Sequence, residues 1–316
     1  MPQKIILQKK EIGLFNNNIY SSYSGFHPLA VNIGEAAIKG ILLELSCTPK
    51  PGLVDRLNNG ANLDMNFTTF ILSSSAISYG MYQCAQLGID FSGKADALLP
   101  EFRRIGLDME RKMFKATGGI NTQKGLIFLE GLVCVSAGSL IRKEQKLTPE
   151  NICQRIKEIT RGIVDRELKT FLNHLTYRNR KLTTGERLFL KYGITGVRGE
   201  VEEGLPTVRE SGLPALQTAL KQGLSLNDAL VQALISIIAV LEDTNVIARS
   251  SPEILSRIVH PMANKAVQLG GMSTTAGRKK IIAIDRYFIR NNINPGGSAD
   301  LLAVTATLYY LSLLSS

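Results

Sequence analysis

The stretch KGLIFLEGLVCVSAGSLI at positions 124–141 decides the fold class, because its apolar residues recur at three- and four-residue steps. The same spacing is present in VNIGEAAIKGILLEL at 31–45 and in FTTFILSSSAISYGMYQCAQLG at 67–88. Alternating β-branched residues between hairpin turns, which would indicate strands, are missing from the sequence. The spacing therefore predicts an all-α fold.

Outward from these segments, the helical pattern continues to the C-terminus. Thr148-Pro149-Glu150 and Ser251-Pro252-Glu253 each combine an N-cap residue with a proline in the first helical turn. No internal repeat or low-complexity linker divides the chain, so we expect a loosely ordered extension over 1–29 and a single multi-helix globular domain over 30–316. Further helices are predicted over 149–173, 183–192, 212–222, 226–243, 252–269, 275–291 and 298–314.

The composition favours an anionic ligand. The 316 residues carry a formal net charge of +10, but the cations form no Lys/Arg run and no nucleic-acid-binding motif is present. A polyphosphate is therefore expected rather than nucleic acid. The apolar runs at 230–242 and 301–314 are shorter than the roughly 18 residues of a membrane span. The four cysteines are widely spaced, which is typical of reduced thiols in a cytoplasmic protein without a membrane anchor.

The predicted helices are joined by long glycine-rich loops, and such loops are where function is expected. The first is CTPKPGLVDRLNNGANLDM at 47–65, in which two prolines exclude a helix around Lys50. Lys50 and Arg56 are candidates for phosphate binding, with Asn59 as a further substrate-binding candidate in the turn. Asp55 and Asp64 supply carboxylates. The alternative is a structural turn with a surface ion pair.

The second loop, ATGGINTQKG at 116–125, precedes a predicted helix. Its two glycines allow the backbone to approach a ligand, while Asn121 and Lys124 provide donors at the helix N-terminus, where phosphate is attracted. A simple N-cap by Asn121 or Thr122 is the alternative.

The third loop, over 193–210, has glycines at every third residue from 193 to 199. This spacing is neither a Walker loop nor a dinucleotide-binding motif. Arg198 stands beside Glu200 and Glu202, and this combination suits a ribose, a base or a magnesium ion. A solvated charge cluster is the alternative.

Two more segments carry polar residues at helix ends. In LEDTNVIAR at 241–249, Asn245 and Arg249 would share one helix face, and Asp243 follows a long apolar run in which an unneeded carboxylate would be costly to bury. The alternative there is exposure at a helix end. The loop over 291–300 contains an anion nest formed by Gly296, Gly297 and Ser298, although Ser298 could equally serve as a helix cap.

Taken together, these segments resemble the triphosphoribosyl-dephospho-CoA synthase family. The resemblance extends in order from about residue 34 to 308, and its segments are TPKPGLVDRLNNGANLDM, GINTQKGLIF, YGITGVRGEVEEGLPTVR, EDTNV and NPGGSADLLAVT. It implies an all-helical enzyme that uses ATP as a donor. In this family the 2′-hydroxyl of 3′-dephospho-CoA attacks the ribose C1 of ATP, adenine leaves, and the anomeric carbon inverts.

The resemblance implies a role for each group of candidates. An inverting displacement needs a base for the hydroxyl and an acid for the leaving group, and the triphosphate with Mg²⁺ needs cations. We expect Asp55 or Glu200 as the base, with Glu202 beside it, and Asp64 and Asp243 as magnesium ligands. The expected partners are ATP, 3′-dephospho-CoA, and downstream a holo-acyl-carrier-protein transferase and citrate lyase, or malonate decarboxylase. The expected cations are Lys50, Arg56, Lys124 and Arg198.

The chain departs from the family pattern at three places. Asn62 and Gln123 stand where relatives commonly have histidine, and Ser250-Ser251 stands where they have two glycines. An amide can donate a hydrogen bond but cannot titrate. Either these histidines are dispensable positioning groups or this chain is a diverged paralogue. Two other functions therefore stay open: a magnesium-dependent nucleotide or ADP-ribosyl hydrolase, and a nucleotide-binding subunit without turnover.

Overall fold

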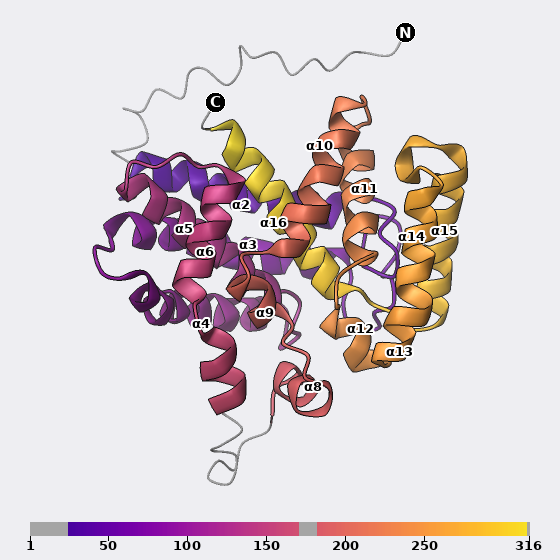
Figure 1. Ribbon diagram of the computed structural model, residues 1–316, viewed down its shortest axis with the longest axis horizontal. Coiled ribbons are helices and arrows are strands. Elements are labelled where there is room, and N and C mark those ends of the chain that lie inside the picture. The colour runs from indigo at the N-terminus through magenta and orange to yellow at the C-terminus, as the bar shows by residue number, and fades with distance from the viewer. Residues whose placement is uncertain (1–24, 171–181, 315–316) are drawn as a thin grey trace.

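The computed structural model describes residues 25–170 and 182–314 (Figure 1). Every regular element in these two ranges is a helix, so the all-α prediction is confirmed. The elements are α2 (Pro28–Ser46), α3 (Phe67–Asp90), α4 (Leu98–Ala116), α5 (Lys124–Arg142), α6 (Pro149–Thr160), α8 (Thr184–Tyr192), α9 (Val197–Glu202), α10 (Leu213–Lys221), α11 (Leu226–Ile238), α12 (Thr244–Arg249), α13 (Pro252–Ile254), α14 (His260–Gln268), α15 (Thr275–Arg290) and α16 (Gly296–Leu313).

The first group of helices packs around α5. This helix contacts α3, α2, α4, α6 and α16, and its side chains are buried nearly all along its length. By length and composition α5 could cross a membrane, but 78% of its apolar window is buried against the other helices, as in the core helix of a globular protein. All four cysteines are buried and free, as expected.

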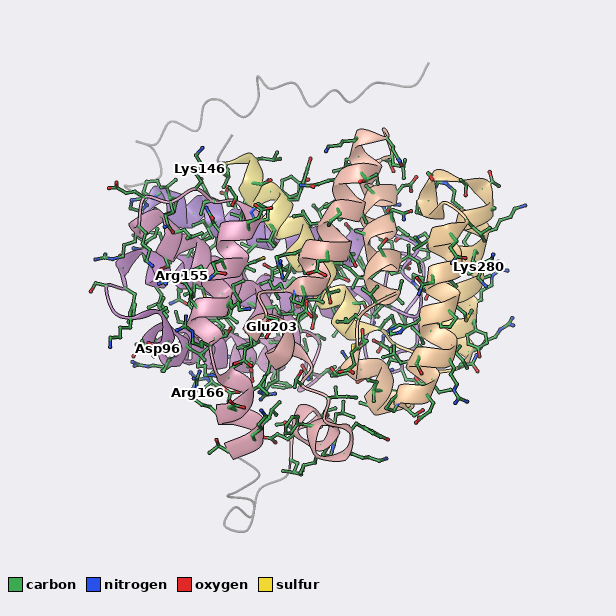
Figure 2. The ribbon with its side chains drawn as sticks, in the orientation of Figure 1. Asp96, Lys146, Arg155, Arg166, Glu203 and Lys280 are labelled. Carbon is green, nitrogen blue, oxygen red and sulfur yellow. The ribbon has the colours of Figure 1, made fainter. Side chains whose placement is uncertain are left out.

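The helix α16 connects the two sides of the molecule. It runs diagonally between the α2–α6 group and the helices α10, α11, α14 and α15 (Figure 1). It packs against α2 and α5 on one side and against α10 and α11 on the other. Charged side chains such as Lys146 and Lys280 point outward from this assembly (Figure 2). The start of α16 is therefore central, and segments that are distant in the sequence meet there.

Several helix boundaries differ from the prediction. The helix α2 begins at Pro28, inside the range assigned to the extension, while residues 1–24 lie outside the described residues. The predicted helix 149–173 is broken after Thr160, because Gly162 adopts a positive φ of 71°. The predicted helix 226–243 ends at Ile238, and the chain then turns into α12.

One helix of the structure was not predicted, and one predicted loop contains a helix. The helix α4 was not predicted, although Leu98, Phe102, Met109 and Met113 form one buried face at helical spacing among its charges. The range 193–210 was predicted to be a loop, but it contains α9 and the start of a π-helical turn over Val208–Gly212. Arg198, Glu200 and Glu202 are therefore presented by a short helix.

Candidate active site

The loop between α2 and α3 is fastened to the protein by buried polar contacts. Lys50 is only 2% exposed, and its Nζ lies 2.5 Å from Glu44 Oε1 at the end of α2. The alternative considered for this loop was a surface ion pair, but the ion pair between Lys50 and Glu44 is buried. Thr48 exchanges two backbone hydrogen bonds with the Asn227 side chain of α11, at 3.0 and 2.8 Å. Lys50 is thus part of the scaffold that fixes the loop.

Asp55 holds the turn of the same loop. Its buried carboxylate accepts hydrogen bonds from the backbone N–H groups of Lys50, Leu57 and Asn58, at 3.1, 2.7 and 3.0 Å. Asp285 of α15 accepts a further bond from Gly52 N at 3.0 Å. A carboxylate that accepts several backbone bonds is a good turn organiser. These bonds account for Asp55 structurally, and its role as a base stays a prediction.

The other candidates in this loop lie at the surface. Arg56 is exposed and makes only long contacts, 3.4 Å to Thr48 Oγ1 and 3.3 Å to Asn227 Oδ1. Asn59 and Asp64 are also exposed. Because Arg56 has no carboxylate partner among the described residues, its guanidinium can reach an incoming phosphate without first breaking an ion pair.

Asn62 joins three of the predicted segments. Its Oδ1 accepts hydrogen bonds from Arg249 Nη2 of α12 at 3.0 Å and from Asn294 Nδ2 at 2.9 Å, while its Nδ2 donates to Asn59 O at 3.2 Å. Arg249 also donates to Ala61 O at 2.8 Å. This amide, at a position where the family resemblance predicts histidine, is therefore buried and bonded on both sides. Arg249 acts as a clamp between α12 and the loop.

Asp243 caps two helices at once. Its Oδ1 accepts from Asn245 N and Val246 N at the start of α12, at 2.9 and 3.4 Å. The same carboxylate accepts from Gly297 N, Ser298 N and Ser298 Oγ at the start of α16, at 3.3, 2.8 and 2.9 Å. The anion nest at Gly296, Gly297 and Ser298 thus receives a carboxylate of the protein itself. A helix cap was the alternative considered for Ser298, but the N-cap of α16 is Pro295, and Ser298 lies inside the helix and donates to Asp243.

The alternative for Asp243 was exposure at a helix end, and it is wrong, because the residue is only 2% exposed. Burial raises its pKa, and the bonds from Ser298, Asn245 and Val246 partly oppose this. Asn245 is exposed beside Gly296, where its Nδ2 would lie 2.8 Å from a Cβ atom at that glycine. Five donors already surround the Asp243 carboxylate, so capping explains its burial, and magnesium binding by it stays a prediction.

The carboxylate of Asp300 lies at the junction of α16 and α5. It is half-buried on the second turn of α16, and its Oδ2 would lie 2.3 Å from a Cβ atom at Gly125 in the first turn of α5. Within residues 25–170 and 182–314, no side chain or backbone group donates a hydrogen bond to it. Burial raises its pKa well above the ordinary value, and the neighbouring carboxyl groups of Glu44, Asp243 and Glu130 raise it further when they are ionised.

Glu130 lies deeper between the same two helices. It is fully buried on α5, where Thr307 Oγ1 of α16 donates to its Oε1 at 2.9 Å and its Oε2 has no hydrogen-bond partner. Burial raises the pKa of Glu130 to about 8, against a smaller opposing effect of the Thr307 bond. At neutral pH the side chain is therefore largely protonated.

The second loop lies beside this junction. Asn121 Oδ1 accepts from Lys124 N at 3.2 Å, but the N-cap residue of α5 is Gln123, so the N-cap considered for Asn121 or Thr122 is not observed. Lys124 is exposed and lies 2.8 Å from Glu110 Oε2. Gln123 is buried, accepts from Ser73 Oγ at 2.5 Å and donates to Ser74 Oγ at 3.1 Å. Like Asn62, it is a buried amide with bonds to both its oxygen and its nitrogen, at a position where the family resemblance predicts histidine.

The short helix α9 carries a separate charge network. Arg198 Nε lies 2.8 Å from Glu167 Oε2, and Arg103 binds the other oxygen of Glu167. Glu200 accepts from Thr207 N and Thr207 Oγ1, at 2.9 and 3.1 Å, and burial raises its pKa. Glu202 is half-buried.

The third loop reaches the central site through a glycine. Gly196, at the start of α9, has φ of 55°, and a Cβ atom there would lie 2.7 Å from Thr244 Cγ2 of α12. Contacts therefore link all five predicted segments in one region around the starts of α5, α12 and α16. Arg198 and the carboxylates of α9 lie on its flank, where they bond to Glu167 and Thr207 rather than to the other candidates.

Three carboxylates of this region were not among the predicted site residues: Glu44, Glu130 and Asp300. Each lies inside a helical apolar run, where a charge without a partner is costly to bury. The cost of burying a carboxylate could have identified these three residues from the sequence, because the same reasoning identified Asp243.

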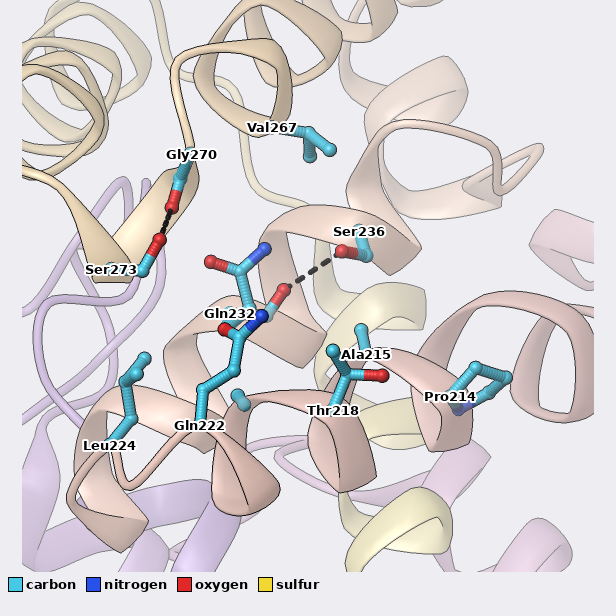
Figure 3. Close-up of a pocket in the computed structure, with 11 residues that line it drawn as sticks. Pro214, Ala215, Thr218, Gln222, Leu224, Gln232, Ser236, Val267, Gly270 and Ser273 are labelled. Atoms are coloured by element: carbon cyan, nitrogen blue, oxygen red, sulfur yellow. Dashed lines mark hydrogen bonds between the residues drawn. The ribbon is translucent and has the colours of Figure 1, made fainter.

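A hollow of about 380 Å³ lies elsewhere, between α10, α11 and α14 (Figure 3). Ser236 and Ser273 along its wall donate to the backbone oxygens of Gln232 and Gly270, at 3.0 and 2.5 Å. Its described lining holds amides and hydroxyls but no charged side chain, and none of the predicted site residues. A polyanion would find no counter-charge there, so we place the active site at the helix junction.

Fold and site define the class: an all-α protein whose polar segments converge on a buried group of carboxylates flanked by cations. Residues 30–316 match the family described as "CitG: ATP:dephospho-CoA triphosphoribosyl transferase". A protein of Malonomonas rubra named "Probable 2-(5''-triphosphoribosyl)-3'-dephosphocoenzyme-A synthase" is 36% identical over 285 residues, covering 90% of this chain and 89% of the relative. No solved structure gives a significant match.

The chain belongs to the triphosphoribosyl-dephospho-CoA synthase (CitG) family. The resemblance deduced from the five sequence segments is confirmed, as is the expected class of enzyme, a triphosphoribosyl transferase.

Proposed function

We propose that this enzyme transfers the 5-triphosphoribosyl group of ATP to the 2′-hydroxyl of 3′-dephospho-CoA, releases adenine, and thereby supplies the prosthetic-group precursor of citrate lyase or malonate decarboxylase. The observation that carries the proposal is the family match over residues 30–316, which includes every segment of the site. The net charge of +10 supports it, because both substrates are polyanions.

The cations divide into available and engaged groups. Arg56 and Lys124 are exposed, the first beside neutral groups only and the second in a surface ion pair of the kind that contributes little. We assign these two to the triphosphate. Lys50 and Arg198 are held by Glu44 and Glu167, so we assign them to positioning the loop and α9.

Magnesium is proposed as a companion of the triphosphate. The described residues contain no group of three carboxylate, histidine or cysteine side chains that could hold a metal ion. Mg²⁺ bound to a nucleotide needs only one or two protein carboxylates, because phosphates and water complete its shell. Asp64 fits this role, since it is exposed and free to turn toward a ligand, whereas the Asp243 carboxylate already has five donors. When bound, the ion would neutralise phosphate charge.

The test is chromatography of the products formed from ATP and 3′-dephospho-CoA. We expect free adenine only when both substrates are present, in equal amount to a triphosphoribosylated coenzyme. Adenine or ADP-ribose products without 3′-dephospho-CoA would instead show the hydrolase, and binding of ATP without any product would show a subunit without turnover.

A further inference from the structure

We propose that Asp300 is the general acid that protonates adenine as it leaves the ribose. This inference rests on the proposed function and assigns one residue of that site a catalytic task. The sequence analysis did not select Asp300, and the geometry points to it.

The position of Asp300 is fixed by two helices. It lies on α16 directly against the first turn of α5, and the absence of a side chain at Gly125 leaves the space that its Oδ2 occupies. The neighbouring turns carry Asn121 and Lys124 on one side and Asp243 on the other. Asp300 therefore lies among the segments that would surround the nucleotide, and its side chain keeps some exposure to solvent.

The surroundings of Asp300 favour its protonated form. Charged carboxylates are stabilised by donors, and no described group donates to this one. Burial is the largest cause of this preference, and the charges of Glu44 on α2 and Asp243 at the α12 start oppose ionisation of a further carboxyl. Glu130 on α5 adds to this opposition only where it is itself ionised. The cation that pairs with Glu44 is Lys50, at 2.5 Å, and no cation of the described residues lowers the pKa of Asp300.

The other carboxylates of the region lack this property. Asp243 accepts from both helix starts, and Asp55 accepts from three backbone N–H groups. Such bonds occupy the carboxylate oxygens and hold both side chains in fixed capping and turn positions. Glu130 is sealed in the core and cannot touch a substrate. Among these carboxyls of the described residues, Asp300 alone has no hydrogen-bond donor on either oxygen and keeps some exposure to solvent.

The chemistry balances as a single displacement. The oxygen of the 2′-hydroxyl forms a bond to C1 of the ribose while the bond from C1 to N9 of adenine breaks, and the electron pair of that bond moves into the purine ring. The Asp300 carboxyl gives its proton to a ring nitrogen, so adenine leaves neutral. The hydroxyl proton passes to a base and returns Asp300 to its acid form by way of solvent.

The experiment compares Asp300→Asn with the wild-type enzyme on two donors. With ATP we expect turnover to fall by about a hundredfold or more, the usual contribution of general acid catalysis, with little change in KM. The second donor is 8-azaadenosine triphosphate, whose extra ring nitrogen lets the base leave more easily as an anion. The ratio of turnover with this donor to turnover with ATP should rise at least tenfold in the variant. Asp96→Asn is the matched control, since Asp96 is exposed at the edge of the molecule (Figure 2).

A second variant tests the placement without altering the carboxyl. Alanine favours a helix more than glycine does, but a methyl group at position 125 would collide with Asp300 Oδ2. Gly125→Ala should therefore lose turnover while keeping the wild-type melting temperature. An unchanged ratio between the two donors in Asp300→Asn, or full turnover in Gly125→Ala, would overturn the assignment. Failure of the wild-type enzyme to release adenine from ATP, or 8-azaadenine from the second donor, would instead overturn the proposed function.

Discussion

The loop over 47–66 and the junction of α5 with α16 both concentrate polar residues, yet they use them in opposite ways. In the loop, Lys50, Asp55 and Asn62 are buried and bonded to partners on α2, the turn itself and α12. At the junction, Asp300 and Glu130 lie between helices with donors for at most one of their oxygens. Satisfied polar groups hold a structure together, while unsatisfied ones mark a place where a ligand or a proton is expected.

The largest effect is expected from breaking the loop. Lys50→Met removes the partner of a buried Glu44, and an uncompensated buried charge costs about 3–5 kcal/mol of stability. The free energy of unfolding from urea denaturation measures this loss. Removing both charges in Glu44→Gln/Lys50→Met should recover part of it. A single variant as stable as the wild type would show that the loop does not depend on this pair.

At the junction, the buried carboxyl of Glu130 should lower the stability of the protein at alkaline pH, whereas the buried pair of the loop raises it. Burial raises the pKa of Glu130 from an ordinary value of 4.5 to about 8 in the folded protein. Between these two pH values the folded state therefore binds more protons than the unfolded state. The free energy of unfolding of the wild type should therefore decrease as pH rises from about 4.5 to about 8, and level off above that pH.

Glu130→Gln should flatten this dependence. Urea midpoints at pH 5.5, 7 and 8.5 provide the measurement, with Glu101→Gln, an exposed side chain, as the control. Equal slopes for Glu130→Gln and the wild type would contradict the buried, protonated state of this side chain.

The smallest effect on turnover and stability is expected from a substitution at Asn62, where the family resemblance predicts histidine. Asn62 already bonds to Arg249, Asn294 and Asn59, so it acts as a positioning group. Asn62→His should leave turnover within a few-fold of the wild type, with a loss of stability of about 1 kcal/mol from altered hydrogen bonds. A gain of about a hundredfold, the size of a general acid–base contribution, would show instead that a histidine transfers protons at this position.

The apolar periodicity predicted the long helices well, and it failed where tertiary contacts decide the chain path. The helix α5 was predicted to within one residue at its end, because its buried face repeats at helical spacing. The helix α11 ends at Ile238, five residues before the prediction, since the chain must turn there to bring Asp243 to two helix starts. Helix α4 could have been predicted from its apolar face, but the many charged residues between the apolar ones make the helical spacing hard to see.

The sequence alone determined the fold class, the family and the five segments that form the site, because periodicity and motif residues are local properties. Only the tertiary structure decided what each charged residue does. In the sequence, Lys50 looks like a phosphate-binding residue and Asp243 like a metal ligand. In the structure, Lys50 is paired with Glu44, and Asp243 accepts hydrogen bonds from Ser298, which is 55 residues away in the chain. Asp300 has no such partner in the described structure, and that difference arises only when α16 packs against α5.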